Sequence, residues 1–271
     1  MEIEQIHKRL TTLLKKYITA IVFDYGKYIP KEKLETLQTI DCNKVIKIYD
    51  TNTINGLCGK GNIHLPSNVN KIFQILRELP EYGTINNHKI FNDNTLINND
   101  NTFGDYVTHL ILSGATIEDY YEDLLLHETV HLCGSDGEYA FNEGLTEFLT
   151  RKISKKHGFR TNGCGYSKEV KIVIELQNIF GEELINKITF ISSMRDIINY
   201  LKENLGDKEA KLFSNIVSVM QQEYNLKYAQ HVSTFQGMDG VKRKCNYYSQ
   251  IDYSIAYDLI AEYKNAQKKN K

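Results

Sequence analysis

The residues with the clearest potential for chemistry are His127, Glu128 and His131, which lie in the segment HETVH. On a helix, the two histidines are one turn apart on one face, with Cβ atoms about 5–6 Å apart. Two imidazole nitrogens at that spacing can bind one zinc ion at about 2.0–2.1 Å each. Glu128 can then sit beside the ion without binding it, where a general base for water belongs. The pattern therefore predicts a zinc site with its base.

The helix that must position these side chains is indicated by the segment ATIEDYYEDLLLHETVHLCG. Thr116 suits the N-cap, and Asp119 three residues later gives a capping-box pattern. Further acids follow in the first turns, where the helix dipole favours negative charge, and Gly134 suits the end of the helix. The leucines around the histidines indicate burial. Burial fits a zinc site, but it also fits two structural histidines in a core, and this segment alone leaves that alternative open.

A third ligand is expected after His131, because a catalytic zinc ion takes three protein ligands and leaves one position for water. The sequence GSDG at 134–137 predicts a turn, and YAFNEGLTEFLTRKI predicts a second helix with an apolar stripe. At about 1.5 Å of rise per residue, the reversal returns Glu143 to the level of the histidines. Gly144 weakens a helix relative to alanine, so its place beside Glu143 predicts a close approach by another backbone.

Glu147 lies one helical turn after Glu143 on the same face of this second helix. A carboxylate there can accept the second N–H of a ligand histidine and fix its tautomer, as ligand histidines nearly always require. The alternative is that both glutamates are solvated acids near a polar helix start. The nearby HETVH segment favours the metal site, with Glu143 as the third ligand and Glu147 as the partner of a histidine.

These two segments resemble a known family. HExxH followed by a helix carrying N-E-x-x-x-[DE] is similar to the gluzincin metallopeptidases, the zincins that include thermolysin and lethal-factor-like enzymes. The resemblance covers the stretch from Glu118 to Thr150 and implies a zincin-like fold with one zinc ion per chain. It implies that zinc is bound by His127, His131 and Glu143, that Glu128 is the general base, and that Glu147 supports a ligand.

A second electrophile usually helps to stabilise the oxyanion that forms at a zinc centre. Tyr139 shortly before the second helix and Tyr166 after it, in the sequence GCGYSKEV, are candidates for this role. The chain contains 18 tyrosines, so a structural role is the more frequent outcome for any one of them. Both tyrosines therefore stay candidates beside the metal ligands.

The composition of the 271 residues limits the classes of partner. The formal net charge is −1, which gives no general basic surface for nucleic acid or an anionic membrane. No apolar run approaches the roughly 18 residues of a membrane span, and the N-terminus has no secretory leader pattern. The five scattered cysteines suggest reduced thiols. We expect a cytoplasmic protein that acts on a peptide or protein. Export without a leader sequence is an alternative location. The sequence says nothing of oligomeric state.

The chain divides by pattern near residue 133. Residues 1–133 predict an α/β lobe that ends in the HExxH helix, and residues 134–271 predict a helical lobe that carries the third ligand. In the first lobe we expect helices at 4–20 and 68–79, strands at 44–50, 61–66 and 106–114, and loops around one or two short strands at 84–105. In the second we expect helices at 140–156, 168–179, 181–190, 194–204, 207–225 and 252–265. The expected class is α+β and zincin-like, with a small mixed sheet and an all-helical second lobe that together form one catalytic unit.

The function that these expectations favour is zinc-dependent hydrolysis of peptide bonds, most simply by an endopeptidase. An edge strand from 44–66 would hold the substrate by strand addition. Two alternatives remain at this stage. One is an intracellular zincin regulator that cleaves one dedicated protein partner, and the other is a non-catalytic zincin-like binding module.

Overall fold

The computed structural model describes residues 3–49, 56–67, 116–134, 140–161, 166–191, 193–228, 231–236, 242–247 and 252–269. Side chains are described for these residues except Ile3, residues 226–228 and the strands at 231–236 and 242–247. The described chain is mostly helical with a small three-stranded sheet, which confirms the predicted α+β class. The helix predicted at 68–79, the loops at 84–105 and the strand at 106–114 lie outside the described residues.

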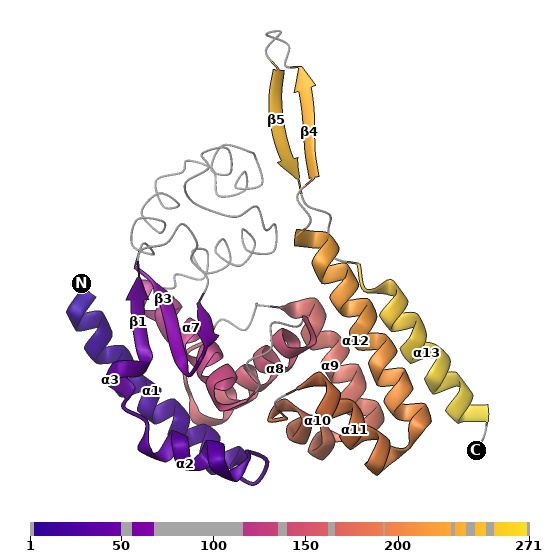
Figure 1. Cartoon of the computed structure of the whole chain (residues 1–271), viewed down its shortest axis with the longest axis horizontal. Coiled ribbons are helices and arrows are strands. Elements are labelled where there is room, and N and C mark those ends of the chain that lie inside the picture. The colour runs from indigo at the N-terminus through magenta and orange to yellow at the C-terminus, as the bar shows by residue number, and fades with distance from the viewer. Residues whose placement is uncertain are drawn as a thin grey trace.

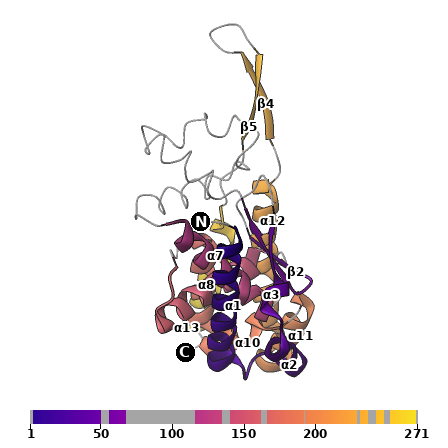
Figure 2. The ribbon, with the colours of Figure 1, turned by 90° about the vertical axis from the view of Figure 1, so that its left-hand side faces the viewer.

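The first helix, α1 (Ile3–Tyr25), extends beyond the predicted end at residue 20. Its apolar face remains buried to the end, with Leu14, Ile21 and Tyr25 in the core, and it packs along the helix that carries HETVH. Two short helices follow, α2 (Lys31–Thr39) and α3 (Cys42–Val45), neither of which the sequence pattern predicted. The helix α1 thus forms the outer wall of the N-terminal part (Figure 2).

The sheet consists of β1 (Ile46–Tyr49), β2 (Leu57–Gly59) and β3 (Asn62–Pro66), in the order β1-β3-β2. The outer strand β1 runs parallel to β3, whereas β2 runs antiparallel to it. Lys60 and Gly61, which join β2 to β3, both have positive φ, as a two-residue hairpin turn of the primed type requires. The sheet is therefore small and mixed, as predicted, although β2 was expected to be part of a turn.

The helix with HETVH is α7 (Ile117–Cys133), and its ends are those that the sequence predicted. The Oγ1 of Thr116 accepts a hydrogen bond from the N–H of Asp119 at 3.1 Å, and the Asp119 carboxylate accepts one from the N–H of Thr116 at 2.8 Å. The N–H of Gly134 closes the last turn on Val130. The helix packs on β2, β3 and α1, and α1 in turn packs on β1, so the two helices lie side by side against the sheet (Figure 1).

The helix α8 (Ala140–His157) packs against α7 and belongs to both hydrophobic cores of the described chain. Leu149 and Ile153 join the core formed with α1, the sheet and α7. Phe141 and Leu145 join the core formed with the later helices. Because α8 is shared, the position of its glutamates is fixed by packing on two sides.

Most of the remaining helices agree with their predicted ranges to within a few residues. They are α9 (Ser167–Phe180), α10 (Glu182–Thr189), α11 (Met194–Leu205), α12 (Asp207–Tyr228) and α13 (Ser254–Lys269). Their apolar faces form the second core around the side chains of Phe213 and Leu176. Among the helices that the structure describes, none has the length and apolar character that crossing a membrane requires.

The prediction of an all-helical second lobe was wrong. The strands β4 (His231–Gln236) and β5 (Lys242–Tyr247) form an antiparallel hairpin that extends from the end of α12 (Figures 1 and 2). The β-branched residues Val232 and Thr234 favour a strand, and Gly237 and Gly240 between the strands favour a turn. Apolar residues at helical spacing before and after this stretch obscured a local pattern that was present in the sequence.

The helices α8 and α9 approach each other closely at Gly144. A Cβ atom at this position would lie 2.8 Å from Cβ of Glu169 and 3.0 Å from its carbonyl carbon. Both distances are well inside van der Waals contact, and one of them is to backbone, which cannot rotate away. The close approach that the sequence predicted beside Glu143 is therefore confirmed, and α9 is the element that makes it.

This packing predicts that Gly144→Ala lowers the free energy of unfolding by about 1 kcal/mol net, since overpacking costs about 1–3 kcal/mol. The gain in helix propensity of about 1 kcal/mol offsets only part of that cost. Chemical denaturation of the metal-free protein measures the change. Gly59→Ala is the matched control, because its new Cβ would meet nothing within 4 Å. An alanine variant at 144 as stable as the parent would contradict the proposed close packing.

Candidate metal centre

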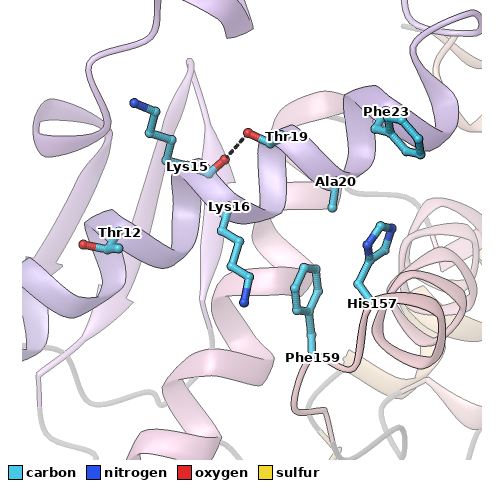
Figure 3. A pocket seen from close by; sticks show the side chains of 8 residues that line it. All are labelled: Thr12, Lys15, Lys16, Thr19, Ala20, Phe23, His157 and Phe159. Carbon is cyan, nitrogen blue, oxygen red and sulfur yellow. Dashed lines mark hydrogen bonds between the residues drawn. The ribbon is translucent and has the colours of Figure 1, made fainter.

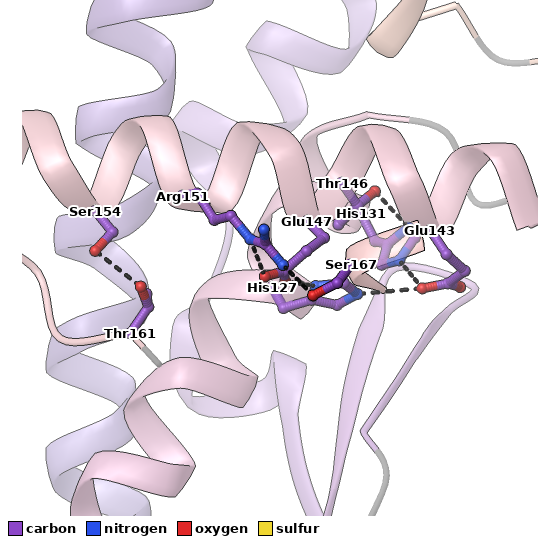
Figure 4. A network of polar contacts seen from close by, with 9 residues as sticks. All are labelled: His127, His131, Glu143, Thr146, Glu147, Arg151, Ser154, Thr161 and Ser167. Carbon is purple, nitrogen blue, oxygen red and sulfur yellow. Dashed lines mark hydrogen bonds and ion pairs between the residues drawn. The ribbon is translucent and has the colours of Figure 1, made fainter. Parts of the chain in front are cut away.

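The two packed helices α7 and α8 bring the predicted metal ligands together. His127, His131 and Glu143 each offer one ligand atom, and the three atoms lie within 4.8 Å of one another. All three side chains are largely buried. Figure 4 shows the imidazoles of α7 directed toward the Glu143 carboxylate of α8. The structure thus joins the three residues that sequence spacing selected.

The distances within this cluster match the spacing of ligands around zinc. The Nε2 atom of His127 lies 3.2 Å from Oε2 of Glu143, and the Nε2 atom of His131 lies 3.4 Å from the same oxygen. Two ligands at about 2.0–2.1 Å from a tetrahedral ion are about 3.3 Å apart. Two imidazoles and one carboxylate are also a donor set that catalytic zinc sites use. The residues therefore fit one zinc ion, with Nε2 of each histidine as its ligand atom.

The opposite nitrogen of each imidazole is held by α8. The Nδ1 atom of His127 lies 3.2 Å from Oε2 of Glu147, for which the sequence predicted a contact with a ligand histidine without specifying which one. The Nδ1 atom of His131 lies 3.3 Å from Oγ1 of Thr146, a contact that the sequence analysis missed. An Nδ1–H that donates to these oxygens leaves the Nε2 lone pair available for a metal ion. Thr146 had no distinguishing pattern in the sequence, since its role depends on the crossing of two helices.

Glu128 is buried beside the edge strand β2. Its carboxylate accepts a hydrogen bond from the backbone N–H of Cys58, and a Cβ atom on Gly56 would lie 2.7 Å from its Oε1. Gly56 therefore leaves the space that this carboxylate occupies. Burial raises the pKa of Glu128, although the nearby imidazoles of His131 and His127 act in the opposite direction. A carboxylate with a raised pKa is better suited to accept and return a proton near neutral pH.

The electrostatics of the cluster favour positive charge at its centre. Burial would raise the pKa of Glu143, but the adjacent imidazoles hold it well below its usual value. Burial would likewise lower the pKa of His127, but hydrogen bonds to Glu143 and Glu147 raise it well above the usual value. The pKa of His131 is also raised, because the attraction of Glu143 outweighs the effect of burial. Protons on the imidazoles or a metal cation can supply this charge.

Tyr166 is the one of the two candidate tyrosines that lies within the described residues, and the structure brings it to the site. Its ring stacks on the imidazole of His127 with centroids 5.5 Å apart and planes inclined by 17°. Its backbone is left-handed, with φ 48° and ψ 36°, which costs a non-glycine residue about 1–2 kcal/mol. Tyr139 lies outside the described residues, and whether either tyrosine stabilises an oxyanion stays a prediction.

Cys133 is close to the site in sequence but takes no part in it. Its thiol is buried, and burial raises its pKa to about 12. A metal ligand must be a thiolate, so this side chain behaves as a small apolar group in the core.

A separate hollow of about 500 Å³ lies on the outer face of α1 (Figure 3). Its lining combines the lysines Lys15 and Lys16 with the rings of Phe23 and Phe159. The ammonium group of Lys16 lies over the ring of Phe159, 5.2 Å from its centroid. None of the five residues assigned to the metal centre contributes to this lining, so the hollow is distinct from the site between α7 and α8.

Comparison of the chain with known proteins returned no matching family model, no matching curated protein and no matching solved structure.

The geometry predicts unequal effects for the two glutamates of α8. Glu143→Ala should abolish tight zinc binding, because two histidines alone hold zinc weakly. Glu147→Ala should retain zinc with an affinity about 10–100-fold lower, as is usual when the partner of a ligand histidine is lost. Titration of each variant with zinc against a chromophoric chelator measures both effects. If Glu147→Ala empties the site while Glu143→Ala stays loaded, the assignment of ligand and partner is reversed.

Proposed function

We propose that the protein is a zinc metallopeptidase that hydrolyses peptide bonds with one zinc ion per chain. The observation that supports this most directly is the convergence of Nε2 of His127, Nε2 of His131 and Oε2 of Glu143, with Glu128 one residue from a ligand. The packing of α7 on the small sheet and against α8 supports the proposal of a zincin-like fold. The gluzincin resemblance of the same residues supports this assignment independently of distances.

The chemistry that a bound zinc ion supplies here is polarisation of the scissile carbonyl and acidification of a water molecule. With zinc bound, Glu128 would accept a proton from the attacking water as the new C–O bond to the peptide carbon forms. Glu128 then gives the proton to the departing amine nitrogen as the C–N bond breaks. The hydrogen bond from the Cys58 N–H limits rotation of the Glu128 carboxylate during both transfers.

The strand β2 is the proposed docking edge for the substrate. Among the described strands it has a single neighbour, β3, and both Gly56 just before it and Cys58 within it adjoin the carboxylate of Glu128. Leu57 on this strand is 46% exposed, an unusual environment for a leucine close to a buried site. An extended peptide that pairs with β2 would have its backbone held by the strand and its carbonyl near the metal ligands. This mode favours an endopeptidase, because strand pairing requires no free terminus.

The substrate is therefore proposed to be a peptide or an extended segment of a protein, encountered in the cytoplasm. The same chemistry serves a general protease and a regulator that cleaves one dedicated protein partner. A non-catalytic binding module has less support, because binding alone does not require a buried base held against β2. Activity on an unfolded protein separates these functions: broad cleavage favours a general protease.

The test of this proposal is Glu128→Gln. The variant should retain its fold and its zinc, but its rate of hydrolysis should fall by roughly three orders of magnitude or more. General base catalysis typically contributes about 10²–10⁴-fold. Cleavage of a peptide library by the zinc-loaded protein, followed by mass spectrometry, gives both the activity and the cleavage sites. Glu118→Gln makes the same change on the same helix away from the site and should be fully active. Near-normal turnover by Glu128→Gln would exclude Glu128 as the base.

A further inference from the structure

The carboxylate of Glu147 is held from two sides. Its Oε2 lies 3.2 Å from Nδ1 of His127, and its Oε1 accepts a hydrogen bond from Nε of Arg151 at 2.7 Å. The glutamate side chain is only 7% exposed, so the guanidinium is a close cation in a site from which water is largely excluded. Figure 4 shows the Arg151 guanidinium and the Glu147 carboxylate, both from α8, beside the imidazole of His127 from α7. Arg151 thus determines where the oxygen that faces His127 can lie.

The same arginine also reaches the start of α9. Its Nη2 donates to Oγ of Ser167 at 3.5 Å, and Ser167 directly follows Tyr166. The ring of Tyr166 stacks on the face of the His127 imidazole, while Glu147 contacts its edge. The contacts therefore close a ring of five residues: His127, Glu147, Arg151, Ser167 and Tyr166.

The backbone conformation of Tyr166 indicates that this closed set of five contacting residues has a function. Its left-handed conformation is one that glycine adopts freely and tyrosine does not, and its side chain makes no capping hydrogen bond to α9. Serine and aspartate are preferred over tyrosine at the N-cap of a helix, because their side chains can accept a hydrogen bond from the first turn. Strained residues of this kind gather at functional sites, where the surroundings hold them in place. Here the strained residue is the one whose ring covers a metal ligand.

We propose that Arg151 and Tyr166 are positioning residues that lock the imidazole of His127, with Arg151 acting through Glu147 and Tyr166 acting on the ring face. Locking one ligand before the ion arrives reduces the ordering needed on binding and so raises the affinity for zinc. The proposal rests on the metal centre described above, but it assigns a role to residues beyond the ligands. It also ties the affinity of the centre to the start of α9.

The experiment is a zinc titration against a chromophoric chelator on folded, metal-free protein. Arg151→Met should weaken zinc binding about tenfold, and Arg151→Lys, which keeps a cation but loses the two-sided contact, should recover part of that loss. Tyr166→Gly relieves the backbone strain and removes the ring, and should weaken binding several-fold. Tyr166→Phe keeps the ring and should bind zinc like the parent. A merely structural role would change the unfolding temperature without this pattern of affinities.

Arg160→Met is the matched control, because Arg160 pairs with Asp119 on α7 as Arg151 pairs with Glu147, but away from the histidines. It should leave zinc affinity unchanged. If the parent binds zinc and the dissociation constants of Arg151→Met and Tyr166→Gly both lie within twofold of the parent value, the positioning role is overturned. The metal centre itself then stands. If Arg151→Met fails to fold, Arg151→Lys and Tyr166→Gly decide in the same way. A parent that binds no zinc overturns both proposals.

Discussion

Buried negative charge between α7 and α8 is the constraint on which the rest of the site depends. Glu128, Glu143 and Glu147 are all largely removed from water, and a buried carboxylate costs several kcal/mol unless a partner compensates it. Two imidazoles and one guanidinium supply that compensation within the described chain. The raised pKa values of the histidines express the same demand, which a divalent cation between them would satisfy directly.

The surrounding elements are arranged to hold these charges at fixed distances. The capping box at Thr116 fixes the start of α7, and the glycine at 56 lets β2 come against the Glu128 carboxylate. Gly144 lets α9 come against α8 beside Glu143, and α9 in turn carries the strained Tyr166. Two of these contacts depend on the absence of a side chain. Close approach of backbone is thus a recurring requirement around this centre.

The sequence predicted the parts of the site that follow from local rules. Helical spacing was sufficient to pair His127 with His131, and the capping pattern at Thr116 was enough to place the start of α7. The contact of Glu147 with His127 followed from the return of α8 along α7. Thr146, Cys58 and Arg151 could not be predicted in this way, because their partners are set by the crossing of helices and the position of an edge strand. The β4–β5 hairpin was missed for a different reason, since its β-branched residues and turn glycines were present in the sequence but were outweighed by the helical patterns on either side.

The central claim is that His127, His131 and Glu143 bind one zinc ion, and metal content tests it most directly. Elemental analysis of protein purified without added metal, and again after incubation with zinc and removal of the excess, gives the stoichiometry. The account predicts close to one equivalent per chain after loading, and loss of that metal to a strong chelator. Less than about a tenth of an equivalent in both samples would contradict it, because a centre of this donor set and spacing should retain zinc.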